Sequence, residues 1–210
     1  SAYTDARNSV EVVATEDNTT VTITPTVALY GGTHAAGVPF TVTLNKGQVY
    51  SFASNSQTGA DHLSGTIVTS DKPVVVDVSD DSATPNGSNQ DLVADQLVPE
   101  DYAGSEYIVI PSPSAANNSI TGSGLSDYAF IFALEDSTDV KVFYQNGSDI
   151  SQQSFTNLMR GDKRSYHFTN NSPIFIWAYH PNEDGSNDGR PIFVFQVTGA
   201  GNELGGTQLP

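Results

Sequence analysis

A ten-residue pattern that occurs twice constrains the fold of this chain more than any other feature. Residues 14–23 read ATEDNTTVTI and residues 133–142 read ALEDSTDVKV, with Ala, Glu, Asp, Thr and Val at matching positions. Each copy starts with an acidic turn and continues with the alternation of polar and apolar residues that is typical of a half-buried strand. The repetition predicts two related units within the 210 residues.

Three further landmarks recur in the same order. They are a Leu-x-x-Gly turn followed by Tyr-x-Phe, a Pro that opens an apolar strand, and a Gln-Leu segment that ends in Pro. In the two halves these landmarks are residues 44–52 and 158–168, residues 69–76 and 169–176, and residues 96–99 and 208–210. We therefore expect a first β repeat over residues 1–104 and a second over residues 105–210.

The pattern of strands and turns predicts an all-β fold. Turn signals such as Asn45-Lys46-Gly47 and Asn146-Gly147 recur roughly every 8 to 12 residues, as in sandwiches and barrels. The one helix candidate, Asp91–Gln96, is too short to change the fold class. We expect two related antiparallel β-sandwich-like repeats, with a propeller-like arrangement of the repeats as the alternative.

The two repeats are expected to end differently. After residues 96–99 the first half continues into a strand within Gly104–Pro111, whereas the second half stops at Pro210. The second repeat is therefore expected to lack its last strand, which would leave an open sheet edge. The missing strand then belongs either to a longer protein or to a neighbouring copy.

A neighbouring copy would supply the strand by β-strand addition. The donor expected for this is Ser1–Ala14, with Val10, Val12 and Ala14 as its apolar residues, and the acceptor lies around Ile192–Leu209. Such a contact is head-to-tail, so it builds a filament unless it closes into a ring.

The charge of the chain excludes two classes of partner. Eight Lys and Arg against 24 Asp and Glu give a net charge of −16, which repels the phosphates of nucleic acids and anionic lipid surfaces. The longest apolar runs, such as Ile174–Ala178, are far shorter than the roughly 20 residues that cross a bilayer. We expect neither nucleic-acid binding nor membrane insertion.

The residues that most catalytic sites need are either absent or not part of a recognisable catalytic motif. The chain has no Cys, which excludes disulfides, thiolate metal sites and cysteine nucleophiles, and it has no Gly-x-Ser-x-Gly nucleophile elbow. The four histidines are not part of a recognisable catalytic motif, and some pair of the many carboxylates will fall at glycosidase spacing by chance. We expect no catalytic residues and no enzymatic activity.

Two groups of oxygen-bearing side chains are candidates for calcium. One is the Asn, Asp and Gly run that contains Asp184, Asn187 and Asp188, and the other contains Asp80 and Asp81. Carboxylate and amide oxygens are the ligands that Ca²⁺ prefers, although neither group has EF-hand spacing. A solvated turn is the alternative interpretation of both.

Asn-x-Ser/Thr sequons mark candidate glycosylation sites. They begin at Asn18, Asn86, Asn117, Asn146 and Asn170, all in expected turns or loops.

Aromatic residues are concentrated in the second half of the chain, which has 14 of them after residue 105 against six before it. They enlarge its core or form a surface for contact. Trp177 lies in an apolar run and is expected in the core, whereas Tyr179 and His180, next to the 182–189 loop, are candidates for ligand contact.

The landmarks resemble the N-terminal domain family of IgG Fc-binding proteins, which occurs in mucus-associated animal proteins and in bacterial surface proteins. The segments that carry the resemblance are Asp17–Val21, Leu44–Gly47, His62–Val76, Gln96–Pro99 and Gly104–Pro111. The second half matches more loosely, because it has no counterpart of the Leu-Ser-Gly-Thr segment. The resemblance implies a non-enzymatic surface protein and supplies no catalytic residue.

These observations predict an extracellular or cell-surface protein that acts by contact, a location also favoured by the abundance of Thr, Ser and Asn and by a start without Met. In one hypothesis it is a structural subunit that polymerises with itself. In the other it is an adhesin module that binds a host or extracellular glycoprotein, or its glycan, through loops such as 79–91 and 180–190. No cofactor is expected apart from calcium.

Overall fold

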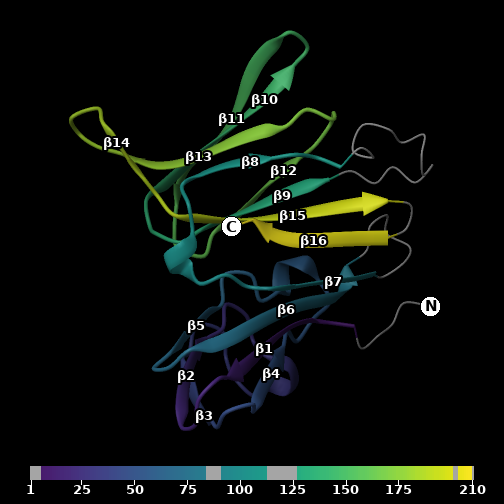
Figure 1. Cartoon of the computed structure of the whole chain (residues 1–210), viewed down its shortest axis with the longest axis vertical. Helices are drawn as coiled ribbons and strands as arrows, with labels where there is room; N and C mark the ends of the chain where they lie inside the picture. The colour runs from purple at the N-terminus through teal and green to yellow at the C-terminus, as the bar shows by residue number, and fades with distance from the viewer. Residues whose placement is uncertain (1–5, 84–90, 113–126, 201–202, 210) are drawn as a thin grey trace. The chain divides into compact units, whose positions relative to one another are not determined.

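The computed structural model describes residues 6–83, 91–112, 127–200 and 203–209 (Figure 1). These residues form antiparallel strands and three short 3-10 turns, with no α-helix among them. None of the sheets closes into a barrel, and the predicted all-β, sandwich-like class is confirmed. The chain divides into two compact units, Ser1–Leu97 and Val98–Pro210.

The first unit contains a four-stranded sheet of order β4-β1-β6-β7 and a three-stranded sheet of order β3-β2-β5. We name them the β1 sheet and the β2 sheet after their inner strands. The strands are β1 (Asn8–Ala14), β2 (Thr19–Thr24), β3 (Phe40–Leu44), β4 (Val49–Ala53), β5 (Ile67–Ser70), β6 (Val74–Ala83) and β7 (Asp91–Gln96). The short helix candidate of the sequence is therefore the edge strand β7.

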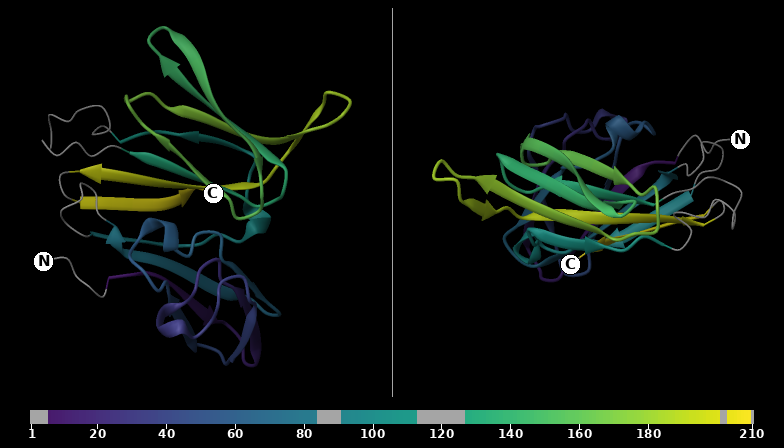
Figure 2. Two further views of the ribbon diagram at one scale, coloured as in Figure 1. Left: turned by 180° about the vertical axis from the view of Figure 1, so that it is seen from behind. Right: turned by 90° about the horizontal axis from the view of Figure 1, so that it is seen from above.

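The second unit also contains two sheets, seen from behind and from above in Figure 2. The β9 sheet has the order β12-β9-β15-β16, and the β10 sheet has the order β11-β10-β13-β14, with β8 also paired to β13. The strands are β8 (Glu106–Val109), β9 (Tyr128–Ala133), β10 (Thr138–Asn146), β11 (Asp149–Leu158), β12 (Lys163–His167), β13 (Ile174–Pro181), β14 (Asn187–Gly189), β15 (Ile192–Ala200) and β16 (Glu203–Leu209).

The two units share one connectivity. The strands β1 to β5 correspond to β9 to β13, and β6 and β7 correspond to β15 and β16, whereas β8 and β14 have no counterpart among the described residues of the first unit. The ten-residue patterns occupy equivalent places in this scheme. Ala14 pairs with Val74 of β6, and Ala133 pairs with Ile192 of β15.

Strand pairing corrects the equivalence expected for the Pro-initiated strand. Pro73 precedes β6, whose partner is β1, whereas Pro173 precedes β13, whose partner is β10. The residue equivalent to Pro73 is Pro191, which precedes β15 in the same sheet position. Both prolines open a buried strand, and local sequence resemblance alone did not show which strand is the partner.

The Tyr-x-Phe landmark is also displaced. Phe52 pairs with Val10 of β1, and the residue that pairs with Ala129 at the equivalent place of β9 is Tyr166. Phe168 lies two positions farther along. The Leu-x-x-Gly turn keeps its predicted equivalence, because Leu44 pairs with Thr19 and Leu158 with the matching Thr138.

The strand that follows Pro99 belongs to the second unit. β8 pairs with β13 along Ile174–Trp177, beside β14, which pairs with the later part of the same strand. The first unit ends at Leu97, after β7, so β8 is a strand of the second unit. The repeats expected over residues 1–104 and 105–210, the second without its last strand, stay predictions.

Alternation along the strands builds a separate core in each unit. In the second unit, Ile131 of β9, Val140 of β10 and Ile176 of β13 are fully buried between the two sheets. In the first unit, Val12 of β1 and Ile23 of β2 hold comparable positions. Side chains from both sheets thus enclose an apolar layer, as sandwich packing requires.

We predict that Ile131→Ala destabilises the second unit by about 2–5 kcal/mol, because it leaves a cavity at a fully buried position. Ile150→Ala is the matched control: Ile150 is 71% exposed, so the same change alters stability by less than about 0.5 kcal/mol. Denaturant unfolding followed through Trp177, the single Trp of the chain, reports on this unit. Equal destabilisation by both changes would contradict the burial pattern.

Candidate contact surface of the second unit

The β10 sheet carries apolar side chains on both of its faces. On β13, Ile174 and Ile176 are buried in the core. Successive strand residues point to opposite faces, so Phe175, Trp177 and Tyr179 lie on the face away from the core. Together with their cross-strand neighbours they form what we call the aromatic face. Its residues are Glu106, Ile108, Lys141, Phe143, Phe175, Trp177 and Tyr179.

The first row of the aromatic face is apolar. The register places Phe143 of β10 and Ile108 of β8 on the two sides of Phe175. The rings of Phe143 and Phe175 are stacked, with centroids 5.9 Å apart. Phe175 is 37% exposed and Ile108 is 69% exposed, so this row presents apolar surface to solvent.

The second row combines an aromatic ring with opposite charges. Lys141 and Glu106 lie on the two sides of Trp177 in the register. The Trp177 ring stacks on Tyr179 with centroids 4.3 Å apart, and Lys141 Nζ lies 5.6 Å from the Trp177 centroid and 5.2 Å from the Tyr179 centroid. These cation–π contacts fix the lysine stem against the rings.

The sequence identified part of this surface and misassigned another part. Tyr179 lies on the aromatic face but is only 8% exposed, packed against Trp177. His180 Nδ1 lies 3.0 Å from the Ser137 carbonyl oxygen, so this ring nitrogen is engaged in a hydrogen bond with the backbone. Trp177, expected in the core, is on the outer face, because the apolar run around it hides the two-residue alternation.

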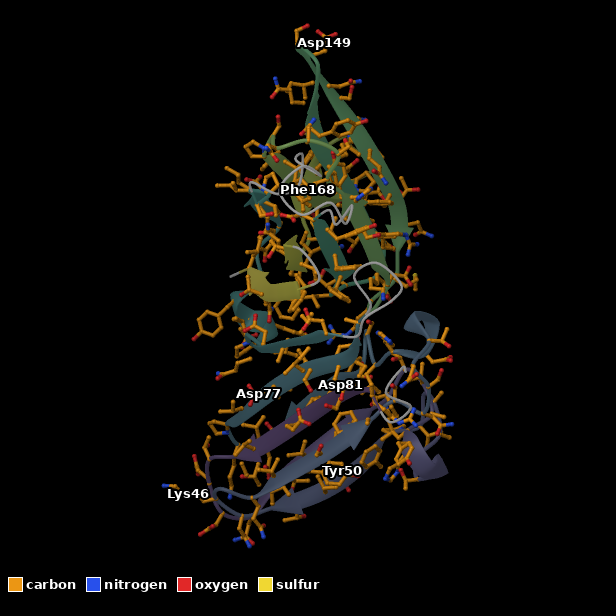
Figure 3. All side chains as sticks on the ribbon, turned by 90° about the vertical axis from the view of Figure 1, so that its right-hand side faces the viewer. Lys46, Tyr50, Asp77, Asp81, Asp149 and Phe168 are labelled. Carbon is orange, nitrogen blue, oxygen red and sulfur yellow. The ribbon has the colours of Figure 1, made fainter. Side chains whose placement is uncertain are left out.

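Asp80 and Asp81, one of the two calcium candidates, both contact other groups of the protein. In the described part of the chain, no three Asp, Glu or His side chains gather as a metal site would require. Asp80 Oδ2 lies 3.1 Å from His62 Nδ1, and the Asp81 carboxylate accepts a hydrogen bond from the Arg7 amide. Figure 3 shows Asp81 on β6.

The second calcium candidate is a self-contained turn. The Asp184 carboxylate accepts hydrogen bonds from the Ser186 hydroxyl at 2.6 Å and from the Ser186 amide at 2.9 Å. Asn187 and Asp188 follow in β14, where Asp188 pairs with His180. Calcium binding at Asp184 would compete with the hydrogen bonds that form the turn.

The sequons differ in how their side chains are engaged. Asn18 and Asn146 are exposed, and the Asn146 amide donates to the Ser151 hydroxyl, whereas the Asn170 amide donates to the Gln145 carbonyl and its oxygen accepts from the Ser172 amide. A glycan on Asn170 would disturb these hydrogen bonds. Asn86 and Asn117 lie outside the described residues.

The expected donor strand is an interior strand of its own unit. Val10, Val12 and Ala14 of β1 are buried in the first core, and β1 pairs with β4 on one side and β6 on the other. The expected acceptor strands, β15 and β16, pair with each other.

A shallow depression lies over the β1 sheet. Its volume is about 370 Å³, and Glu11 and Asp77, directly opposite in the register, contribute to its lining. The Ser9 and Ser51 hydroxyls both donate to Glu11 Oε1, each at 3.1 Å. Figure 3 shows Asp77 on this sheet. These hydrogen bonds order the polar side chains on this side of the sheet.

We predict that Ser186→Ala raises the pKa of Asp184. The Ser186 hydroxyl, followed by its amide, holds this pKa below the ordinary Asp value, because both stabilise the ionised carboxylate. The contribution of Asp184 to stability is therefore present above the unfolded-state pKa and is lost as the pH falls through the lower folded-state pKa. Carboxyl NMR titration of both proteins measures the change, and identical titration curves would contradict this account.

The described residues contain no helix with the length and hydropathy of a membrane span. No curated protein and no solved structure matches the chain. A family model described as "IgGFc binding protein" matches residues 1–201 of the 210. This match confirms the resemblance found in the sequence, and the chain belongs to the IgGFc binding protein family.

Proposed function

We propose that the chain is a non-catalytic extracellular binding module that holds a glycoprotein partner against the aromatic face of its second unit. The observation that carries this proposal is the apolar row of Phe143, Phe175 and Ile108 on the outside of the β10 sheet. A sheet face that served only as a solvated surface would alternate apolar residues inside with polar residues outside.

The chemistry of the face suits contact with a protein. Aromatic residues are enriched in interfaces, and the energy of binding is concentrated in a few well-packed side chains. Lys141 and Glu106 flank Trp177 and supply charges of both signs, which favour one orientation of the partner. The net charge of −16 adds long-range attraction to a partner with basic residues.

The family description names the first partner to test, the Fc part of IgG. Fc is an extracellular glycoprotein, so it presents both protein and glycan surfaces. The rings of the aromatic face suit either surface, and the sequence predicts the 180–190 loop next to Tyr179 as a further contact region. Comparing Fc before and after enzymatic removal of its glycan separates the two.

Self-assembly into a filament is the alternative function expected from the sequence. With Ser1–Ala14 as donor it requires β1 to leave β4 and β6 and to withdraw Val10 and Val12 from the first core. The binding function needs no such rearrangement, and for that reason we favour it.

We predict that Phe175→Ser and Ile108→Ser each weaken binding to Fc by about tenfold or more, because each removes exposed apolar surface from the centre of the contact. Leu92→Ser is the matched control, since Leu92 is 59% exposed but lies on β7 of the first unit. Its affinity is expected to stay within about twofold of the unsubstituted protein.

Surface plasmon resonance with immobilised Fc measures these affinities at several salt concentrations. Loss of binding in the Leu92 variant alone would place the contact on the first unit. Failure of the unsubstituted protein to bind either form of Fc would exclude Fc as the partner.

A further inference from the structure

The strand β11 is an open edge of unusual length. It spans ten residues, Asp149–Leu158, and β10 is its only strand partner in the described part of the chain. Most of its side chains are exposed, including Ile150 at 71%. Figure 3 labels Asp149 at the tip of the hairpin that β10 and β11 form.

The direction of the backbone groups follows from the register. The two strands are joined by the two-residue turn Gly147-Ser148, with Gly147 at a φ of 64° and Asn146 paired to Asp149. In such a hairpin the pair next to the turn is hydrogen-bonded, and hydrogen-bonded pairs then alternate along the ladder. The N–H and C=O groups of Ile150, Gln152 and Ser154 therefore point away from β10, toward the open edge.

A hydrogen bond at the opposite edge of the sheet gives the same alternation. The Ala178 amide of β13 donates to the Ser105 carbonyl at 2.8 Å, so even-numbered residues of β13 bond toward β8. Odd-numbered residues of β13 then bond to β10, including Phe175, which pairs with Phe143. Even-numbered residues of β10 are left to bond with β11, as the hairpin turn requires.

Other sheet edges of the molecule are shorter or charged. The edge strands β3 and β4 have five residues each, and β12 carries Lys163 and Arg164. Natural proteins protect edges with short strands, charges or prolines. Between Asp149 and Leu158, β11 has no charged residue and no proline. Its bulge lies near the far end, and the register from Asp149 to Phe155 is regular.

We propose that β11 pairs in antiparallel fashion with β11 of a second copy of this chain, about a twofold axis at Gln152. In this register the outward backbone groups of Ile150 face those of Ser154 of the partner subunit, and Gln152 faces its own counterpart. Asp149 falls opposite Phe155 of the partner subunit, so no two like charges oppose each other.

The absence of charged side chains along β11 suits a second copy as the occupant. Two copies with a net charge of −16 repel each other, and they approach most closely where the surface lacks charge. The Ile150–Leu158 stretch is such a place. A basic partner, in contrast, would gain nothing from this strand that the acidic parts of the surface do not offer more strongly.

The pairing has a structural consequence for binding. The twofold contact is isologous, so it closes into a dimer and does not extend into a filament. The two β10 sheets become one continuous sheet, and a twofold axis perpendicular to it turns both aromatic faces to the same side. The dimer therefore offers two equivalent contact surfaces, with the gain in avidity that two linked sites provide.

The test is sedimentation equilibrium of the full chain over a range of concentrations. We expect the mass to rise from one chain toward two, and no further. Raising the ionic strength from about 0.01 M to 1 M shortens the Debye length from roughly 30 Å to 3 Å, which weakens the repulsion and strengthens the dimer.

Gln152→Pro is the specific variant. The Gln152 amide points to the open edge, so a proline there keeps the bonds to β10 and removes the donor at the centre of the contact. We expect a variant with an unchanged circular dichroism spectrum that remains monomeric. Two lysine variants support it: Gln152→Lys places two lysines across the axis and weakens the dimer by about tenfold or more, whereas Thr156→Lys changes the net charge equally at an exposed residue of β11 far from the axis.

Two results would overturn the proposed dimer. An unsubstituted protein that stays monomeric at high concentration and high salt would overturn the proposal, as would dimerisation of Gln152→Pro at the original strength. Masses beyond the dimer would point to an open, head-to-tail contact. Should Gln152→Pro fail to fold, the comparison of the two lysine variants decides: equal weakening by both would overturn the proposal.

Discussion

The apolar layer between two sheets is the interaction on which each unit depends. The chain has no Cys, and the described residues contain no α-helix, so neither a disulfide nor a packed helix supports the fold. Stability comes from burying one face of each sheet against the other, with Ile131 and Val140 as central residues of the second unit. This requirement fixes which residue of every strand points inward, and thereby which residues remain outside.

The aromatic face consists of side chains of the β10 sheet that point away from the core of the second unit. β13 supplies Ile174 and Ile176 to the core, yet it carries large apolar side chains at the intervening positions as well. Fold stability needs only one of these two sets, so the other set calls for a separate explanation. Its stacked rings, with Lys141 and Glu106 on the two sides of Trp177, form an ordered surface, and we assign this surface to contact with a partner.

The sequence predicted the fold class, the repeat and the family, because these depend on local signals. The equivalence of the ten-residue patterns held in the structure, since an acidic turn between two strands is defined by neighbouring residues. The equivalence of Pro73 and Pro173 did not hold, because it depends on which distant strand is the partner. The strand after Pro173 pairs with β10, whereas the strand after Pro191 pairs with β9. Long-range packing determines these partners, and resemblance between short segments does not reveal it.

The contact surface was harder to predict for a related reason. A run such as Ile174–Ala178 is apolar at every position, so the period of two that separates core from surface is hidden. Only the register with β10 and β8 shows that Phe175 and Trp177 share a face with Ile108. Val10 and Val12 were likewise predicted as donor residues because the sequence does not show that β1 pairs with β4 and β6 of its own unit.

Hydroxyl-radical footprinting of the chain with and without bound Fc tests the central claim most directly, because it reports the solvent access of individual side chains. We predict that oxidation of Phe175, Trp177 and Ile108 falls on binding, while oxidation of Tyr30, exposed on the first unit, is unchanged. Protection of Tyr30 with full oxidation of Phe175 and Trp177 would contradict it.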